Sequence, residues 1–156
     1  MSDISDGPSR RERIISSLTL SESDVENLEM VAPLIAFTPR RVRRFMTVYT
    51  VVRARLSLDA HESSAIAFTT AALVGAPNTL GRQLLSAESI QPIETIGQWL
   101  DRVDIQYEND AESARVTGFL KESDSIRTLP LAEVLSLLPI AVRFASGMDG
   151  GETAVA

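Results

Sequence analysis

The spacing of apolar residues is the feature that most constrains what this chain can fold into. From about residue 17 to residue 146, apolar side chains recur at steps of three and four, without sustained alternation of period two. Such spacing lines one face of a helix with apolar groups, and that face must be buried against other helices. The pattern predicts an all-α fold, a compact bundle of six or seven short helices joined by short turns.

The chain of 156 residues is expected to form one domain with polar ends. We predict a disordered lead-in over residues 1–16, a helical domain over 17–146 and a flexible tail over 147–156. The longest apolar stretch, about residues 65–76, is too short to span a bilayer. The N-terminal residues lack the apolar core of a signal peptide. These observations predict a cytoplasmic protein that makes no membrane contact.

Two helix starts carry clear capping signals. Ser21 is the expected N-cap of a first helix that runs from Glu22 to about residue 36, because Asp24 sits at the capping-box position. Pro33 should kink or shorten this helix. Thr38 caps a second helix, which begins at Pro39 and runs to about residue 56.

The remaining helices are predicted from their apolar periodicity and from the breaks between them. They are expected at about Glu62–Val74, Thr79–Ala87, Ile93–Val103, Ala111–Glu122 and Leu131–Ala145, with a strand considered at 104–109. The first helix should bury Val25, Leu28, Val31, Leu34 and Ile35, and the second Val42, Phe45, Met46, Tyr49, Val52 and Leu56.

Composition argues against several kinds of chemistry. The chain has no cysteine, which removes disulfides, thiolate metal sites and cysteine nucleophiles. Its single histidine, His61, is too little for a typical zinc site or a catalytic triad. Asp101 and Asp104 are interpreted as an ordinary acidic face, and no metal site is predicted. Trp99 is expected in the core. The formal charge of −6 disfavours contact with nucleic acid.

An arginine cluster opens the second helix and is the main functional signal. Pro39 is followed by Arg40, Arg41, Arg43 and Arg44, which lie at the partly positive end of the helix dipole. Each such cation costs a few tenths to about 1 kcal/mol, so something negative should compensate. One interpretation is pairing with carboxylates of the same fold, such as the acidic start of the first helix. The other is a site at which Arg40, Arg41 and Arg44 bind phosphate or another anion.

The segment that contains this cluster resembles a signature near the C-terminal end of KAP-type P-loop NTPases, which are related to STAND and AAA+ ATPases. In that family a Pro-Arg pair opens a helix with the pattern P-R-x-V-K/R-R-F-x-N-x-Y. The matching residues are Pro39, Arg40, Val42, Arg43, Arg44, Phe45 and Tyr49, whereas Thr47 replaces the usual Asn. Resemblance extends loosely over about residues 17–144, and Ala145-Ser146 depart from the aromatic end of the family's closing motif.

In that family the helical region is a lid on the nucleotide-binding core. The resemblance implies that Arg40 senses nucleotide phosphates, with Arg41 and Arg44 in support. The chain lacks the G-x-x-x-x-G-K-[ST] loop and a magnesium-binding acid after a strand. We therefore expect no catalysis and no cofactor of its own. ATP would be bound only together with a partner core, in a setting such as bacterial defence.

Two other functions remain alternatives. The first is a helical protein–protein adaptor whose arginines dock an acidic partner, with self-association into a homo-oligomer also open. The second is a nucleic-acid-binding domain that uses the same arginines. Residues 71–84 resemble a helix-turn-helix in residue type, but Gly81 falls where an aliphatic residue should pack.

Overall fold

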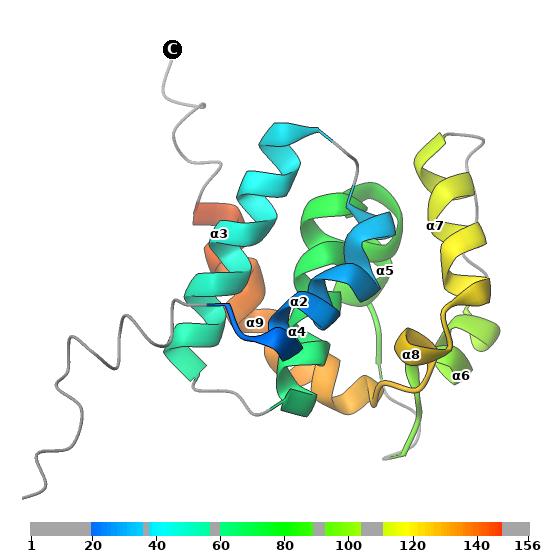
Figure 1. Cartoon of the computed structure of the whole chain (residues 1–156). Coiled ribbons are helices and arrows are strands. Elements are labelled where there is room, and N and C mark those ends of the chain that lie inside the picture. The colour runs from blue at the N-terminus through cyan, green and yellow to red at the C-terminus, as the bar shows by residue number, and fades with distance from the viewer. Residues whose placement is uncertain (1–19, 36–37, 57–59, 89–92, 104–110, 148–156) are drawn as a thin grey trace, which may run out of the picture.

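The computed structural model describes residues 20–35, 38–56, 60–88, 93–103 and 111–147. This part of the chain is helical and contains no strand, which confirms the predicted all-α bundle (Figure 1). The elements are α2 (Glu22–Val31), η1 (Ala32–Leu34), α3 (Pro39–Leu56), α4 (Ala60–Gly75), η2 (Pro77–Gly81), α5 (Arg82–Leu85), α6 (Ile96–Arg102), α7 (Ala111–Glu122), α8 (Asp124–Arg127) and α9 (Leu131–Gly147). The predicted lead-in, nearly all of the tail, and the considered strand lie outside the described residues. None of the described helices is long and apolar enough to cross a membrane.

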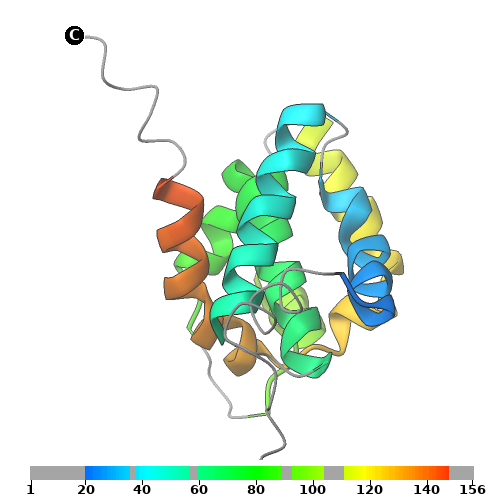
Figure 2. The same ribbon diagram turned by 60° about the vertical axis from the view of Figure 1, so that its left-hand side comes forward.

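Helix α4 is the centre of the bundle. The helices α2, α3 and α9 all pack against it, and they surround it in the views of Figures 1 and 2. Every residue from Ala65 to Ala72 is buried. A helix that is apolar on all sides must be enclosed, which explains the apolar stretch of the sequence. Its many alanines allow the surrounding helices to approach closely.

Two threonines on α4 are buried completely, but only one has a partner for its hydroxyl group. The Thr69 hydroxyl donates to the Ala65 carbonyl oxygen at 2.8 Å, one helical turn back. The Thr70 hydroxyl oxygen has no hydrogen-bond partner within the described residues. Burying an unpaired hydroxyl costs about 1–3 kcal/mol. The core therefore contains a local source of instability at Thr70.

Replacing Thr70 by valine should stabilise the fold, because valine has the same shape without the unpaired hydroxyl. We expect Thr70→Val to raise the free energy of unfolding by about 1 kcal/mol in urea titrations followed by circular dichroism. Thr69→Val is the matched control, and it should change stability by less than about 0.5 kcal/mol because its hydroxyl only adds a second bond to a helical carbonyl. A loss of stability in Thr70→Val would show that this hydroxyl is satisfied.

The face that α2 turns inward is more polar than its sequence predicted. Ser21 and Asp24 form the predicted capping box, and α2 ends at Val31 before the 3-10 turn that contains Pro33. The buried residues of α2 are Asp24, Asn27 and Val31, whereas Val25 is 46% exposed. The prediction that Val25 packs in the core was therefore wrong. Val42 of α3 was likewise predicted in the core but is 40% exposed, and Val48 is buried instead.

Asp24 is buried because α3 supplies partners for its carboxylate. The Tyr49 hydroxyl donates to one carboxylate oxygen at 2.6 Å, and the Arg53 guanidinium pairs with the other. The backbone N–H of Ser21 donates to the same second oxygen at 2.7 Å. Burial raises the pKa of Tyr49, and the nearby Asn27 amide partly opposes this shift. The start of α2 is thus fixed to the last turns of α3 by charge-assisted bonds.

Asp24→Asn should destabilise the protein, because it removes the charge that balances Arg53 while keeping the size of the side chain. Breaking a buried ion pair on one side costs about 3–5 kcal/mol, and urea unfolding should show a loss of about 3 kcal/mol. Glu22→Gln is the control, since Glu22 lies in the same first turn but is exposed. Equal effects of the two substitutions would mean that the helix dipole alone, and not the buried pair, makes Asp24 important.

A smaller group of helices, α6 to α8, completes the bundle (Figure 1). Helix α7 packs against η1 and η2, and α8 packs against both α6 and α7. Helix α6 begins at a capping box formed by Thr95 and Gln98. Backbone bonds from Ile96 to the Leu129 carbonyl and from Leu131 to the Glu94 carbonyl connect it to the start of α9. Trp99 is 1% exposed, as expected for a core residue.

Candidate functional site

The arginine cluster occupies the first two turns of α3, as the sequence predicted. Thr38 precedes the helix, and its hydroxyl oxygen lies 3.4 Å from the Arg41 backbone nitrogen. Arg40 and Arg43 are exposed, whereas Arg41 and Arg44 are half-buried. The cluster is therefore divided. Two arginines extend over the surface, and two turn toward the interior on the same side of α3 as its core residues.

The two inward arginines reach the C-terminal ends of other helices. Arg41 Nη1 lies 3.4 Å from the carbonyl oxygen of Gly75, the last residue of α4. Arg44 Nη2 donates to the Ala145 carbonyl oxygen near the end of α9, at 2.7 Å. The last carbonyls of a helix lack partners within it and carry about half a negative charge in total. Cations from α3 thus cap two helices, which partly compensates for their placement at the positive end of their own helix.

A third arginine, which the sequence analysis did not single out, joins this group from α7. Arg115 donates to the carbonyl oxygens of Pro33 at 2.8 Å, of Leu34 at 2.7 Å and of Gly75 at 3.1 Å. Burial lowers its pKa, the Glu112 carboxylate opposes this shift, and the positive charge of Arg41 lowers the pKa further. Arg41 and Arg115 therefore share the Gly75 carbonyl and repel each other.

Gly75 makes this convergence sterically feasible. A β-carbon at this position would lie 2.2 Å from the Leu34 carbonyl oxygen and 2.9 Å from the Ile35 α-carbon. Because no side chain intervenes, η1 passes directly against the end of α4. This contact places the carbonyls of Leu34 and Gly75 together, where one guanidinium, that of Arg115, can bind both.

A pocket of about 320 Å³ opens beside the inward arginines. Arg41 and Arg44 line it from α3, while the ends of α4 and α9 and the η2–α5 segment supply the other walls. The wall is about equally polar and apolar, and its larger apolar side chains are Leu73, Val74, Pro77, Leu85 and Val142. Leu85 is 58% exposed. The arrangement is a small recess that combines guanidinium groups with apolar side chains, which suits a ligand that is part apolar and part anionic.

Arg41 is the least compensated of the inward arginines. Its bond to Gly75 is longer than the 2.7–3.2 Å typical of N–H···O bonds. No carboxylate in the described segments pairs with it. The acidic start of α2, the internal partner considered from the sequence, instead reaches Arg53 at the opposite end of α3 through Asp24. Arg41 thus faces the pocket with positive charge in excess.

Arg40, which the family resemblance puts first, does not line this pocket. It is exposed on the surface at the second residue of α3. Of the three predicted anion-binding residues, Arg41 and Arg44 line this recess and Arg40 does not.

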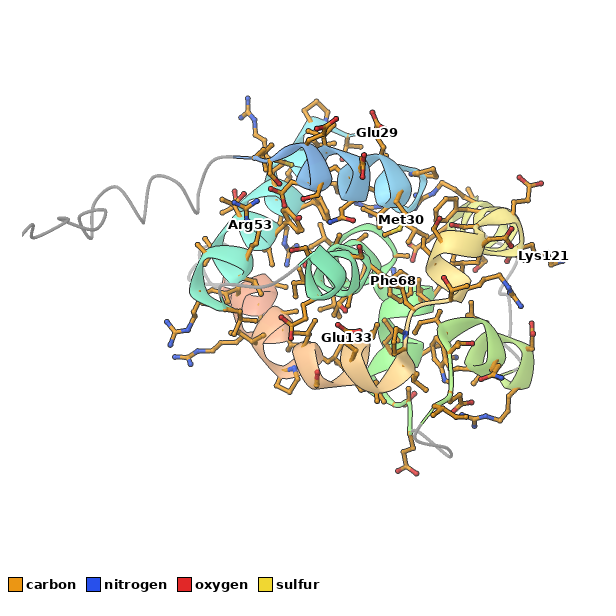
Figure 3. The ribbon with its side chains drawn as sticks, turned by 60° about the horizontal axis from the view of Figure 1, so that its bottom comes forward. Glu29, Met30, Arg53, Phe68, Lys121 and Glu133 are labelled. Atoms are coloured by element: carbon orange, nitrogen blue, oxygen red, sulfur yellow. The ribbon has the colours of Figure 1, made fainter. Side chains whose placement is uncertain are left out.

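A larger pocket, of about 660 Å³, lies between α2, α4 and the start of α9. Its wall carries the carboxylates of Glu26 and Glu133 and no basic residue. Figure 3 shows α4 nearly end-on, with Met30 of α2 and Glu133 of α9, two residues of this wall, on either side. Its negative charge disfavours an anion, which would bind more favourably at the recess beside Arg41 than in this pocket.

The other sequence candidates have structural roles or lie outside the description. Gly81 packs against α4, where a β-carbon would lie 2.9 Å from the Ala72 carbonyl oxygen. The second helix of the supposed helix-turn-helix consists of the π-helical turn η2, which continues directly into α5 and ends at Leu85. Asp101 pairs with Arg127 at 2.8 Å. The His61 side chain and Asp104 are not described. No three metal-ligating side chains cluster within the described segments.

No protein-family model, no curated protein and no solved structure matches the chain. The fold and the recess at Arg41 therefore carry the functional conclusion.

Proposed function

We propose that this chain is a non-catalytic binding domain in which Arg41, supported by Arg44, receives an anionic group presented by another molecule. The observation that carries the proposal is the half-buried Arg41 guanidinium, which lines a recess, lies near a second cation, Arg115, and makes one long hydrogen bond. A half-buried guanidinium interacts with a negative charge more strongly than one that is fully in water. An incoming anion would relieve the repulsion between Arg41 and Arg115.

The resemblance to the helical lid of KAP-type NTPases supports a regulatory setting for this binding. In such a setting, a separate nucleotide-binding core would present phosphate to the lid, and the domain would act through that partner. The recess shifts the expected contact from Arg40 to Arg41 and Arg44. An adaptor that docks an acidic protein partner would use the same recess, so both settings share the requirement for Arg41.

The proposal predicts that anion binding depends on Arg41 and not on its exposed neighbours. In a titration with sodium phosphate and with sodium isovalerate at constant ionic strength, the Nε–Hε nuclear magnetic resonance signal of Arg41 should shift and saturate with at least one of the two anions. Because Arg41→Gln lacks this signal, the Nε–Hε signal of Arg44, which lines the same recess, follows the titration in the parent and in the variants. Arg41→Gln should weaken the binding at least tenfold, because charge-assisted bonds are worth about 1.5–3 kcal/mol.

Arg43→Gln is the matched control, since Arg43 lies two residues away on the same helix but is exposed and does not line the recess. It should bind as the parent does. Thermal unfolding of both variants establishes that they fold. Uniform, non-saturating shifts of all arginine signals with both anions would contradict the proposal. Saturable shifts that are largest at Arg40 would contradict it as well, and would favour Arg40 as the anion-binding residue, as the family resemblance implies.

A further inference from the structure

The walls of the Arg41 recess hold information about the ligand beyond its charge. Leu73, Leu85 and Val142 line the recess together with Arg41. Leu85 leaves more than half of its surface in water, although it adjoins a recess that could bury it. A ligand that filled the recess with apolar groups would remove this surface from water, at about 25 cal/mol per Å² buried. A bare inorganic anion would gain nothing from these walls.

The ends of two helices make the recess unfavourable for a multiply charged anion. The carbonyl oxygens of Gly75 and Ala145 belong to the C-terminal turns of α4 and α9, whose dipoles place negative charge there. A phosphate group with nearly two negative charges would be repelled by both ends and would need several donors. A carboxylate carries one charge and matches a single guanidinium through two parallel bonds.

From these walls and helix ends, we infer that the recess binds a carboxylate side chain flanked by aliphatic residues in a protein partner. The inference rests on the proposed function and names its ligand class. The carboxylate contacts Arg41, and the aliphatic groups cover Leu85 and Val142. At about 320 Å³ the recess lies at the lower end of the range for ligand pockets, which suits side chains of a peptide segment better than a whole nucleotide.

Charge and apolar contact both contribute in this arrangement, so each can be removed separately. The probe is an acetylated and amidated pentapeptide with glutamate between two leucines. The control peptide has glutamine in place of glutamate. Isothermal titration calorimetry of the whole chain should show that the glutamate peptide binds at least tenfold more tightly than the glutamine peptide and more tightly than ATP or inorganic phosphate.

Two variants separate the contributions of the protein. Arg41→Gln should weaken binding of the glutamate peptide at least tenfold, so that the two peptides bind with equal affinity. Leu85→Ser should weaken binding of both peptides several-fold. The ratio of their affinities should stay the same, because the substitution changes only an apolar side chain of the wall. Leu85 is exposed, so this substitution should leave folding intact, and Arg43→Gln again serves as the unaffected control.

Failure of this inference and failure of the proposed function give different results. ATP or phosphate that binds more tightly than the glutamate peptide, in a manner that depends on Arg41, would overturn the carboxylate assignment and leave the proposed function standing. Equal affinity of the two peptides would also overturn the assignment. Absence of any binding that depends on Arg41 would overturn both.

Discussion

The C-terminal end of α4 is the point on which the rest of the structure depends. Helix α4 is enclosed by α2, α3 and α9, so its last carbonyls cannot all be solvated and need donors from the protein. Gly75 lets η1 approach this end directly, and guanidinium groups from α3 and α7 bind its carbonyl oxygen. One constraint, a buried helix end, thus brings two cations to the same place and creates the excess of positive charge at the recess.

The same structure explains why an acidic chain can keep a cationic recess. Two buried carboxylates are engaged elsewhere: Asp24 with Tyr49 and Arg53, and Glu94 with Arg102. The first pair fixes α2 to α3, and the second connects residue 94 with the end of α6. Their negative charge holds helices together and does not neutralise Arg41. The acidic pocket between α2 and α9 lies at a different part of the bundle from the recess.

Much of the fold could be predicted from the sequence, because helix starts and apolar periodicity are local signals. The caps at Ser21 and Thr38 and the bounds of α3 and α7 were predicted correctly from such signals. The inward face of α2 was not, because burial of Asp24 depends on Tyr49 and Arg53, more than 20 residues away. The position of Arg115 depends likewise on contacts with Gly75 and Leu34. The sequence does show that Arg115 lies beside the apolar face of this helix, which indicates partial burial. Periodicity alone does not show what the side chain of such a residue binds.

The central claim is that Arg41 retains positive charge that an anion with an apolar body can meet in the recess. The most direct measurement is anomalous X-ray scattering from crystals soaked in 4-bromobenzoate, because bromine locates the apolar part of the ligand and ordinary density locates its carboxylate. We expect a carboxylate on Arg41 and a bromine peak among Leu73, Leu85 and Val142. A carboxylate bound at Arg40 or Arg43, with the recess empty, would contradict it.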